Sequence, residues 1–265
     1  MKQQQTHYQQ PQVLVTRPAH QAKPLLMQLQ QQGFEAIPFA VIEICDVPPS
    51  DALIQQLKHL EQYALLIFIS ANAVHKGMDC LQTVSASITQ PVLAIGAATA
   101  KALKHYNVTP LTLKSQQFDS ETLLEHPALQ GDNIQGKKIL IFRGQAGREV
   151  LADNLRKRGA MVEYAAVYRR QKAQQDSRPL LQHWQTRGID LITVSSNEAL
   201  QNLYDMLGMA GRDILLKTAI IVPSTRCVQL AQQLGFTADI MQATSAADEA
   251  VLSAVKKWQQ QHITS

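Results

Sequence analysis

The sequence predicts an α/β protein built from two similar parallel-sheet domains, which arose by tandem duplication and are joined by a two-stranded linker with a cleft between them. Short apolar runs, such as residues 139–142, alternate with segments in which apolar residues recur at helical spacing. A continuous apolar run is typical of a strand buried on both faces of a parallel sheet. The regular alternation of strand and helix favours parallel sheets covered by helices.

An internal repeat is the second observation. The apolar run 13–15, followed by Arg17, recurs 126 positions later as the run 139–142, followed by Arg143. Runs 66–72 and 191–197 match at an offset of 125, and runs 93–99 and 219–225 match at 126. Each match is an apolar strand, then small or polar residues, then a helix. Three matches in the same order indicate a duplication.

Length and composition are the third observation. A chain of 265 residues, 45% of them hydrophobic, has room and apolar material for two cores. No apolar run approaches the ~20 residues of a membrane helix. Residues 1–12 are rich in Gln and lack the apolar segment of a signal peptide, so we expect a flexible tail.

The numbers and spacing of cysteines and histidines indicate the cellular compartment and whether a metal is bound. The three cysteines, Cys45, Cys80 and Cys227, are far apart and odd in number, which indicates reduced thiols in a cytoplasm. The eight histidines show no ligand spacing, so we expect no metal. The net charge of +4 is spread over many helix faces, which either meet solvent or line a cleft for a polyanionic ligand. We expect no nucleic-acid and no membrane partner, because no basic block is interleaved with aromatic residues.

The first half is expected to contain five strand–helix units. Gly33 stands where the first helix should stop, because glycine readily adopts the left-handed conformation of a helix end. Ser50 or Asp51 can cap the second helix. Expected strands cover 13–15, 34–37, 65–69, 92–95 and 108–113, and expected helices cover 52–62, 72–81, 97–106 and a segment from residue 122, in addition to the first helix.

The second half repeats this pattern. Gly159 ends the helix that follows the strand 139–142, at the position equivalent to Gly33. Further strands are expected at 161–168, 191–194, 218–222 and 238–241, and helices at 179–187, 197–207, 224–234 and 248–260.

Two segments at equivalent positions interrupt the alternation. Each combines an extended apolar piece with polar or proline-containing sequence, which opposes regular structure. We interpret residues 38–50 and 163–175 as paired interdomain linkers. The expected domains are then 13–37 together with 176–260, and 51–162.

Small polar residues at strand ends are the first candidates for a site. In parallel α/β sheets, ligands bind beyond the carboxyl ends of the strands, where helix N-termini favour anions. Each such residue could instead only cap its helix. The recurrence of the set in both halves indicates a shared site, formed by Ser70, Asn72, Thr99, Ser195, Ser196, Asn197, Ser224 and Thr225.

Arg17, Arg143 and Tyr168 are the remaining candidates. The two arginines occupy equivalent turns and could pair with ligand carboxylates or anchor those turns. Tyr168 ends an extended segment, where it could pack or offer a hydroxyl as a proton donor. The sequence contains no P-loop, no G-x-S-x-G elbow and no G-x-G-x-x-G motif.

Five motifs together resemble the uroporphyrinogen-III synthase family. They are Val15-Thr16-Arg17-Pro18, residues 68–74, residues 94–100, Arg143-Gly144 with Gly147-Arg148-Glu149, and Val167-Tyr168-Arg169-Arg170. The resemblance covers residues 13 to 258. The second copy departs from the first at Val222-Pro223, where Gly96-Ala97 stands in the first.

The resemblance implies a cofactor-free hydro-lyase of tetrapyrrole and heme biosynthesis. Its substrate is linear hydroxymethylbilane, which loses its hydroxyl as water and closes to uroporphyrinogen III after inversion of ring D through a spiro intermediate. The enzyme acts mainly by positioning the chain. The resemblance also implies that Tyr168 assists departure of the hydroxyl, and that Thr99, Ser224, Thr225, Ser70 and Ser195 face the cleft.

The full expected site follows from these arguments. Tyr168 is the expected catalytic residue, and the expected substrate-binding residues are Arg17, Ser70, Asn72, Thr99, Arg143, Gly144, Arg148, Ser195, Ser196, Asn197, Ser224 and Thr225. We expect a monomer that receives hydroxymethylbilane by transient handover from hydroxymethylbilane synthase.

Two alternatives stay open on the sequence. A non-catalytic two-domain protein that binds a polyanionic small molecule would share the duplication and the polar cleft. A two-domain glycosyltransferase is the second, but the chain is short for one and shows no nucleotide site.

Overall fold

The computed structural model describes residues 10–111, 123–147 and 149–262. The chain divides into two compact units. Unit 1 contains the chain up to Glu43 and again from Gln171, and unit 2 is the continuous segment Ile44–Arg170. The chain therefore crosses between the units twice, once after Glu43 and once after Arg170.

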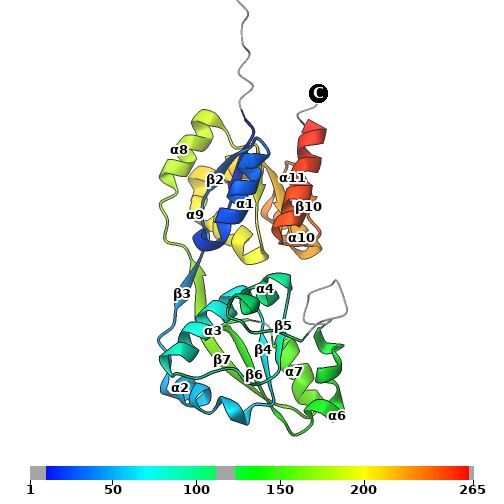
Figure 1. Ribbon diagram of the computed structural model, residues 1–265. Helices are drawn as coiled ribbons and strands as arrows, with labels where there is room; N and C mark the ends of the chain where they lie inside the picture. Colours follow the sequence, from blue (N-terminus) through cyan, green and yellow to red (C-terminus); the bar gives the residue numbers. More distant parts are fainter. Residues whose placement is uncertain (1–9, 112–122, 148, 263–265) are drawn as a thin grey trace, which may run out of the picture. The chain divides into compact units, whose positions relative to one another are not determined.

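Unit 1 is built on a parallel sheet with the strand order β10-β9-β8-β1-β2. Strand β1, near the start of the chain, pairs with β8 from the second half, with Leu14 opposite Ile192. The strands are β1 (Gln12–Val15), β2 (Glu35–Pro38), β8 (Leu191–Thr193), β9 (Ala219–Val222) and β10 (Ile240–Gln242). The helices are α1 (Ala19–Gln31), α8 (Arg178–Arg187), α9 (Asn197–Leu216), α10 (Thr225–Leu234) and α11 (Asp248–His262) (Figure 1).

Unit 2 is built on a sheet with the order β3-β7-β6-β4-β5, in which β7, β6, β4 and β5 are parallel. The strands are β3 (Ile42–Asp46), β4 (Leu65–Phe68), β5 (Val92–Ala94), β6 (Lys138–Gly144) and β7 (Met161–Lys172). The first two residues of β3 and the last two of β7 are assigned to unit 1. The helical elements are α2 (Asp51–Lys58), η1 (Leu60–Gln62), α3 (Ala71–Thr83), α4 (Ala97–His105), η2 (Pro127–Leu129), α6 (Gly131–Ile134) and α7 (Val150–Lys157).

Four of the five strands in each sheet follow the same order. The order β2-β1-β8-β9 in unit 1 corresponds strand for strand to β7-β6-β4-β5 in unit 2. These are the strands that the sequence repeat pairs, so the arrangement agrees with a duplication. The expected fold class, two similar α/β units with parallel sheets, is confirmed; the finer boundaries and the linker assignment stay predictions.

Alternating side chains divide the core of unit 2 into two layers. Leu66, Phe68 and Phe142 belong to one apolar cluster, whereas their neighbours Ile67 and Ile141 belong to another. This period of two follows from strand geometry, and the strands are apolar at every position because both faces are covered. The rings of Phe68 and Phe142 stack with centroids 4.3 Å apart.

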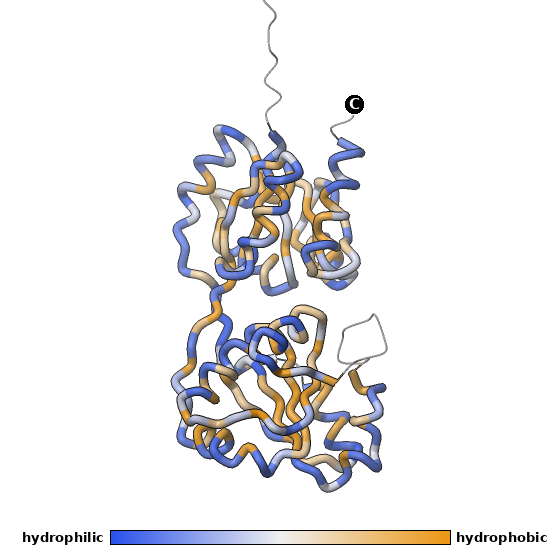
Figure 2. Tube along the Cα trace, viewed as in Figure 1, coloured by the Kyte–Doolittle hydropathy of each residue, from blue (hydrophilic) through white to orange (hydrophobic). Residues whose placement is uncertain are grey.

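Helices α1 and α11 cover one face of the unit 1 sheet together and lie against each other (Figure 1). Leu25 and Leu29 of α1 meet Val255 and Trp258 of α11 in a single buried cluster. Full burial of each such side chain contributes about 1.5–3 kcal/mol. Hydrophobic residues accordingly concentrate inside each unit and polar residues on its helix surfaces (Figure 2).

Three expected elements differ from the structure. Residues 108–111 form no strand, and the rest of the expected strand 108–113 lies outside the described residues, as does the helix start at residue 122. Helix α9 does not stop at Leu207 but resumes after a break at Gly208, whose φ is 56°. Strand β7 extends beyond its expected end at Tyr168 to Lys172, and the amide of the next residue, Ala173, donates to the Val41 carbonyl. Gln12, assigned to the tail from sequence, is buried as the first residue of β1.

Candidate active site

A pocket of about 260 Å³ lies in unit 2 at the carboxyl ends of its strands. Its wall combines apolar side chains from strand ends with two tyrosines and two arginines. The lining residues are Ile69, Ile95, Ile141, Arg143, Ala146, Gly147, Leu151, Ala152, Tyr164, Tyr168 and Arg170. An apolar wall with a few convergent polar groups at the carboxyl edge of a parallel sheet is the usual form of a ligand site.

A bulge sets the direction of Tyr168. Arg143 of β6 pairs with Ala166 of β7, whereas the next residue, Gly144, pairs with Tyr168, so Val167 is an extra residue in β7. A bulge of this kind re-aims the side chain that follows it. Gly144 is required beside it, because a Cβ atom there would lie 3.0 Å from the Tyr168 ring.

The hydroxyl of Tyr168 has two neighbours. It lies 3.1 Å from Oγ of Ser70, the N-cap residue of α3, and 3.5 Å from Nη2 of Arg170. Tyr168 is in the pocket wall but exposes no surface to solvent, whereas Arg170 is exposed. The phenol is thus fixed within unit 2 by a hydroxyl on one side and a guanidinium on the other.

Arg143 is a buried cation with a dense set of contacts. Its side chain is 5% exposed, and its Nη1 donates to Oε1 of Glu149 at 2.9 Å. Its Nε donates to the carbonyl of Gly144 at 3.2 Å, and its guanidinium lies 4.4 Å from the centroid of the Tyr164 ring. Gly147 completes the surroundings, since a Cβ atom there would lie 2.6 Å from Nη2.

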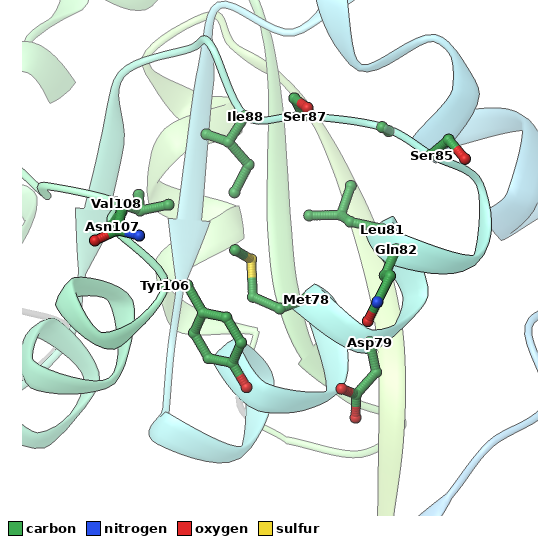
Figure 3. Close-up of a pocket in the computed structure, with 11 residues that line it drawn as sticks. Met78, Asp79, Leu81, Gln82, Ser85, Ser87, Ile88, Tyr106, Asn107 and Val108 are labelled. Carbon is green, nitrogen blue, oxygen red and sulfur yellow. The ribbon is translucent and has the colours of Figure 1, made fainter.

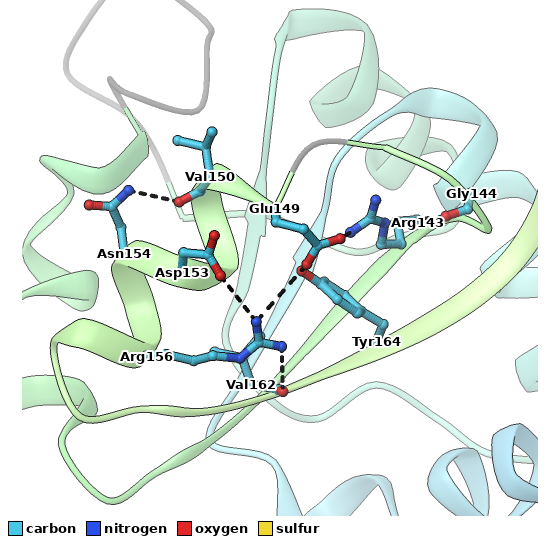
Figure 4. Close-up of polar contacts among 9 residues, drawn as sticks. All are labelled: Arg143, Gly144, Glu149, Val150, Asp153, Asn154, Arg156, Val162 and Tyr164. Carbon is cyan, nitrogen blue, oxygen red and sulfur yellow. Dashed lines mark hydrogen bonds and ion pairs between the residues drawn. The ribbon is translucent and has the colours of Figure 1, made fainter.

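Glu149 accepts hydrogen bonds from two residues of this pocket. The Tyr164 hydroxyl donates to its Oε2 and Arg143 to its Oε1, and Arg156 lies 4.0 Å away (Figure 4). The Tyr164 hydroxyl, then Arg143, holds the pKa of Glu149 below its usual range. Burial, followed by the bond to Glu149, raises the pKa of Tyr164. The carboxylate is therefore ionised at neutral pH and Tyr164 is a neutral donor.

The serines at strand ends act as helix caps. Oγ of Ser70 accepts from the Ala73 amide at 3.1 Å, and Ser196 and Ser224 accept from the amides of the third residue on at 3.1 and 3.4 Å. This is the capping geometry expected of serine before a helix. Only Ser70 among the three also has a contact with a candidate catalytic group, the Tyr168 hydroxyl.

The remaining polar candidates differ in exposure. Thr99 and Asn72 are 2% and 9% exposed in unit 2. In unit 1, Asn197 donates to the Arg226 carbonyl at 3.3 Å, the exposed Thr225 donates to Gln242 at 3.2 Å, and Ser195 is half-buried. Their roles toward a substrate stay predictions.

Arg17 has contacts equivalent to those of Arg143. It pairs with the carboxylate of Asp248, the first residue of α11, and donates to the Ala246 carbonyl at 2.6 Å. Arg17 follows β1 and Arg143 lies near the end of β6, and each joins its strand end to the start of a helix.

Four of the expected residues lie together at the unit 2 pocket, namely Ser70, Arg143, Gly144 and Tyr168. Thr99 lies in helix α4 of the same unit. Arg17, Ser195, Ser196, Asn197, Ser224 and Thr225 belong to unit 1. Arg148 lies outside the described residues.

Sequence reasoning missed Glu149, Tyr164 and Arg170 as parts of this cluster. Glu149 and Arg170 stand in motifs that carried the family resemblance, so the signal was present without a role attached to it. Tyr164 packs against one core layer of unit 2 and Tyr168 belongs to the other, yet both line the pocket. Their meeting depends on the bulge at Val167, which the sequence does not signal.

Among the residues that the structure describes, no group of three or more His, Cys, Asp or Glu side chains could hold a metal ion. Over the same residues, no helix has both the length and the apolar character needed to span a membrane.

The comparisons with known proteins agree on one family. The family model described as uroporphyrinogen-III synthase HemD matches residues 23–251. The chain belongs to the uroporphyrinogen-III synthase family. Uroporphyrinogen-III synthase of Escherichia coli K12 is 33% identical over 92% of this chain and 99% of its own, and that of Salmonella typhimurium LT2 shows the same values.

Solved structures of the uroporphyrinogen-III synthase family share the fold. A mutant synthase from Thermus thermophilus has a TM-score of 0.60 at 14% identity, over 94% of this chain and 99% of its own. The Helicobacter pylori 26695 enzyme has a TM-score of 0.60 at 16% identity, over 94% and 100%. The expected family and the expected activity, that of a cyclising lyase, are confirmed.

A larger hollow in unit 2 is less suited to this family's chemistry. It has a volume of about 580 Å³ and lies between the end of α3 and the end of α4 (Figure 3). Its lining contains the carboxylate of Asp79 and neither Lys nor Arg. A ligand rich in carboxylates would meet like charge there, whereas the smaller pocket presents two guanidinium groups.

Proposed function

We propose that the chain converts linear hydroxymethylbilane to uroporphyrinogen III, and that the unit 2 pocket is where the leaving hydroxyl departs. The supporting observation is the Tyr168 hydroxyl held between Ser70 and Arg170 beside the buried Arg143. A phenol, a guanidinium and a carboxylate-binding cation in one pocket match a substrate that carries a leaving hydroxyl and several carboxylates.

In this proposal Tyr168 is the general acid. The bond between the methylene carbon and the hydroxyl oxygen breaks with its electron pair moving to oxygen, and the Tyr168 hydroxyl supplies the proton that makes water. The electron-rich pyrrole stabilises the positive charge left on the methylene carbon. Ser70 and Arg170 orient the phenol, and the nearby guanidinium favours the phenolate that forms.

Because Tyr168 exposes no surface, a group beside it has to move before the substrate reaches its hydroxyl. Arg170 is the best placed, being exposed and 3.5 Å from the hydroxyl. A substrate carboxylate that pairs with Arg170 would uncover the phenol and so couple binding to proton donation.

The remaining work is positioning. The bilane closes unaided, so the enzyme has to hold ring D where closure follows inversion through the spiro intermediate. We assign the substrate carboxylates to Arg143, Arg148 and Arg17 and to the strand-end groups, namely Gly144, Ser70, Asn72, Thr99, Ser195, Ser196, Asn197, Ser224 and Thr225. No cofactor enters the scheme.

The substitution Tyr168→Phe tests the role of the hydroxyl. We expect kcat to fall about 100-fold, the lower range for loss of a general acid, with the fold retained by circular dichroism. Tyr204→Phe, which removes a phenol in unit 1, is the matched control and should keep the kcat of the parent. A Tyr168→Phe enzyme with the kcat of the parent would remove the hydroxyl from the mechanism.

We also propose a cytoplasmic monomer that takes its substrate by transient handover from hydroxymethylbilane synthase. The support for the compartment is that Cys45, Cys80 and Cys227 are all free thiols. Sedimentation equilibrium of the pure protein, with and without the preceding enzyme, tests the oligomeric state and the handover. A stable dimer would contradict the first part of this proposal.

A further inference from the structure

Glu149 is the point on which three donors of unit 2 converge. Arg143 binds one carboxylate oxygen at 2.9 Å, and the Tyr164 hydroxyl donates to the other. Arg156 approaches that second oxygen at 4.0 Å (Figure 4). Two cations and one phenol on a single carboxylate form a complete binding site for one carboxylate group.

The donors and the acceptor differ sharply in burial. The side chain of Arg143 is 5% exposed, whereas that of Glu149 is 52% exposed. A buried guanidinium requires an anionic partner, because an uncompensated buried charge is strongly destabilising. Glu149, which is half in solvent, can be exchanged for another carboxylate, so Arg143 is the fixed part of the pair and Glu149 the exchangeable part.

The Glu149 side chain does not cap helix α7. It occupies the N-cap position of α7, but its side chain forms no capping hydrogen bond to that helix. The N-terminal turn of α7 has an acidic residue of its own, Asp153. The position of the Glu149 carboxylate therefore follows from Arg143, Tyr164 and Arg156, and not from the needs of the helix.

Two of the three donors, Arg143 and Tyr164, line the pocket assigned above to the substrate. Gly147 packs closely against Nη2 of Arg143, where a Cβ atom would come within 2.6 Å. A carboxylate that enters the pocket meets these two donors, which now hold Glu149.

We propose that Arg143, Tyr164 and Arg156 form a binding site for one carboxylate of the substrate, and that Glu149 occupies this site until the substrate carboxylate displaces it. The inference rests on the proposed function of the pocket. Glu149 keeps the buried guanidinium paired in the free enzyme and competes with the substrate for it. A purely structural Glu149, which only anchors Arg143, is the alternative to be separated by experiment.

The substitution Glu149→Gln distinguishes a competing Glu149 from a purely anchoring one. The amide has nearly the shape of the carboxylate but carries no charge. Its single oxygen can accept from Arg143, and its NH2 group can then only donate to the Tyr164 hydroxyl. Competition predicts that KM for hydroxymethylbilane falls about fivefold while kcat stays within about twofold, since one charge-assisted hydrogen bond to the competitor is weakened. Anchoring predicts that KM rises or kcat falls, and either result, or an unchanged KM, overturns the proposal.

Asp79→Asn is the matched control for charge. Asp79 lies on α3 in the same unit, is 61% exposed and pairs with Lys76 at 3.8 Å, so its substitution removes the same charge without removing a partner of Arg143, Tyr164 or Arg156. The KM of this variant should stay within about twofold of the parent. A fall in KM equal to that of Glu149→Gln would mean that general electrostatics, and not displacement of a competitor, accounts for the effect.

A second measurement reads the site without turnover. In Glu149→Ala the carboxylate position is vacated, and acetate should raise the unfolding temperature more than acetamide or chloride does at equal ionic strength. The parent, whose site is filled, should show no such preference. Equal responses to acetate and acetamide would contradict a carboxylate site. If the parent is inactive but Glu149→Ala still prefers acetate, only the proposed function is contradicted.

Discussion

Arg143 connects most of the residues that distinguish the unit 2 pocket. Because its guanidinium is buried, it needs the charged partner Glu149 and packs over the ring of Tyr164. Its Nη2 lies so close to position 147 that only glycine fits there without a shift. From sequence, Arg143 was a candidate either to bind carboxylates or to anchor a turn. The geometry permits both, because the Arg143–Glu149 pair ties the strand-end turn to α7 and still presents the guanidinium to the pocket.

Gly144 is the residue of β6 against which the Tyr168 ring packs. Its missing side chain lets the Tyr168 ring lie against the backbone of β6. We expect Gly144→Ala to displace the ring, to reduce synthase activity severely and to cost about 1–3 kcal/mol of stability, as overpacking does. Urea unfolding combined with an activity assay measures both effects.

Gly131→Ala is the control for Gly144→Ala. Gly131 begins α6, and a Cβ atom there would meet nothing within 4 Å. Its stability should be unchanged or slightly raised. If Gly144→Ala behaved like Gly131→Ala, the close approach of Tyr168 to β6 would not be needed for function.

At the scale of elements, the sequence predicted which helices and strands exist better than it predicted where each one begins and ends. Apolar strand runs and serine caps carry local signals, so β4 begins where expected and α3 and α10 begin within one residue of their expected positions. The bulge in β7 has no local sequence signal. Val167 is an ordinary strand residue, and it is unpaired only because of the register between β7 and β6. The true end of β7 likewise depends on pairing beyond Tyr168, which composition does not reveal.

Helix α11 ends in a pH-sensitive contact. Nδ1 of His262 lies 2.9 Å from the Trp258 carbonyl and Nε2 lies 2.8 Å from Oδ2 of Asp239. Both partners accept, so both contacts are satisfied only by the protonated ring. The Trp258 carbonyl, then Asp239, raises the pKa of His262 above its usual value of 6.5.

This contact predicts a pH dependence of stability. Since the pKa is raised in the folded state, the contribution is fully present below the unfolded pKa and is lost as pH rises through the folded pKa. We expect the free energy of unfolding of the parent to fall, relative to His262→Gln, as pH rises from about 6 through 8. Parallel pH profiles of the two proteins in urea titrations would contradict this.

At the scale of the whole chain, the repeat was the most informative part of the sequence. An offset of 126 between Arg17 and Arg143 predicted two similar units, and four strands of each sheet share one order. The pairing of β1 with β8 brings the first strand of the chain into a sheet with strands of the second half. Local patterns cannot specify such long-range pairing; the equivalence of the two halves is what made it foreseeable.

The site was less predictable than the fold for a physical reason. In the proposed mechanism the reaction depends on positioning and one proton donor, which leaves no dense catalytic motif in the sequence. Tyr168 and Arg143 could be selected because they stand in motifs of the family. The competing carboxylate of Glu149 became visible only when its distances to Arg143 and Tyr164 were known.

The central claim is that the chain directs closure of hydroxymethylbilane with inversion of ring D. The most direct test generates hydroxymethylbilane in situ, adds the purified protein, oxidises the products and separates the uroporphyrin isomers chromatographically. The account predicts that the product changes from the type I isomer, formed without enzyme, to the type III isomer. Folded protein that leaves only the type I isomer would contradict it.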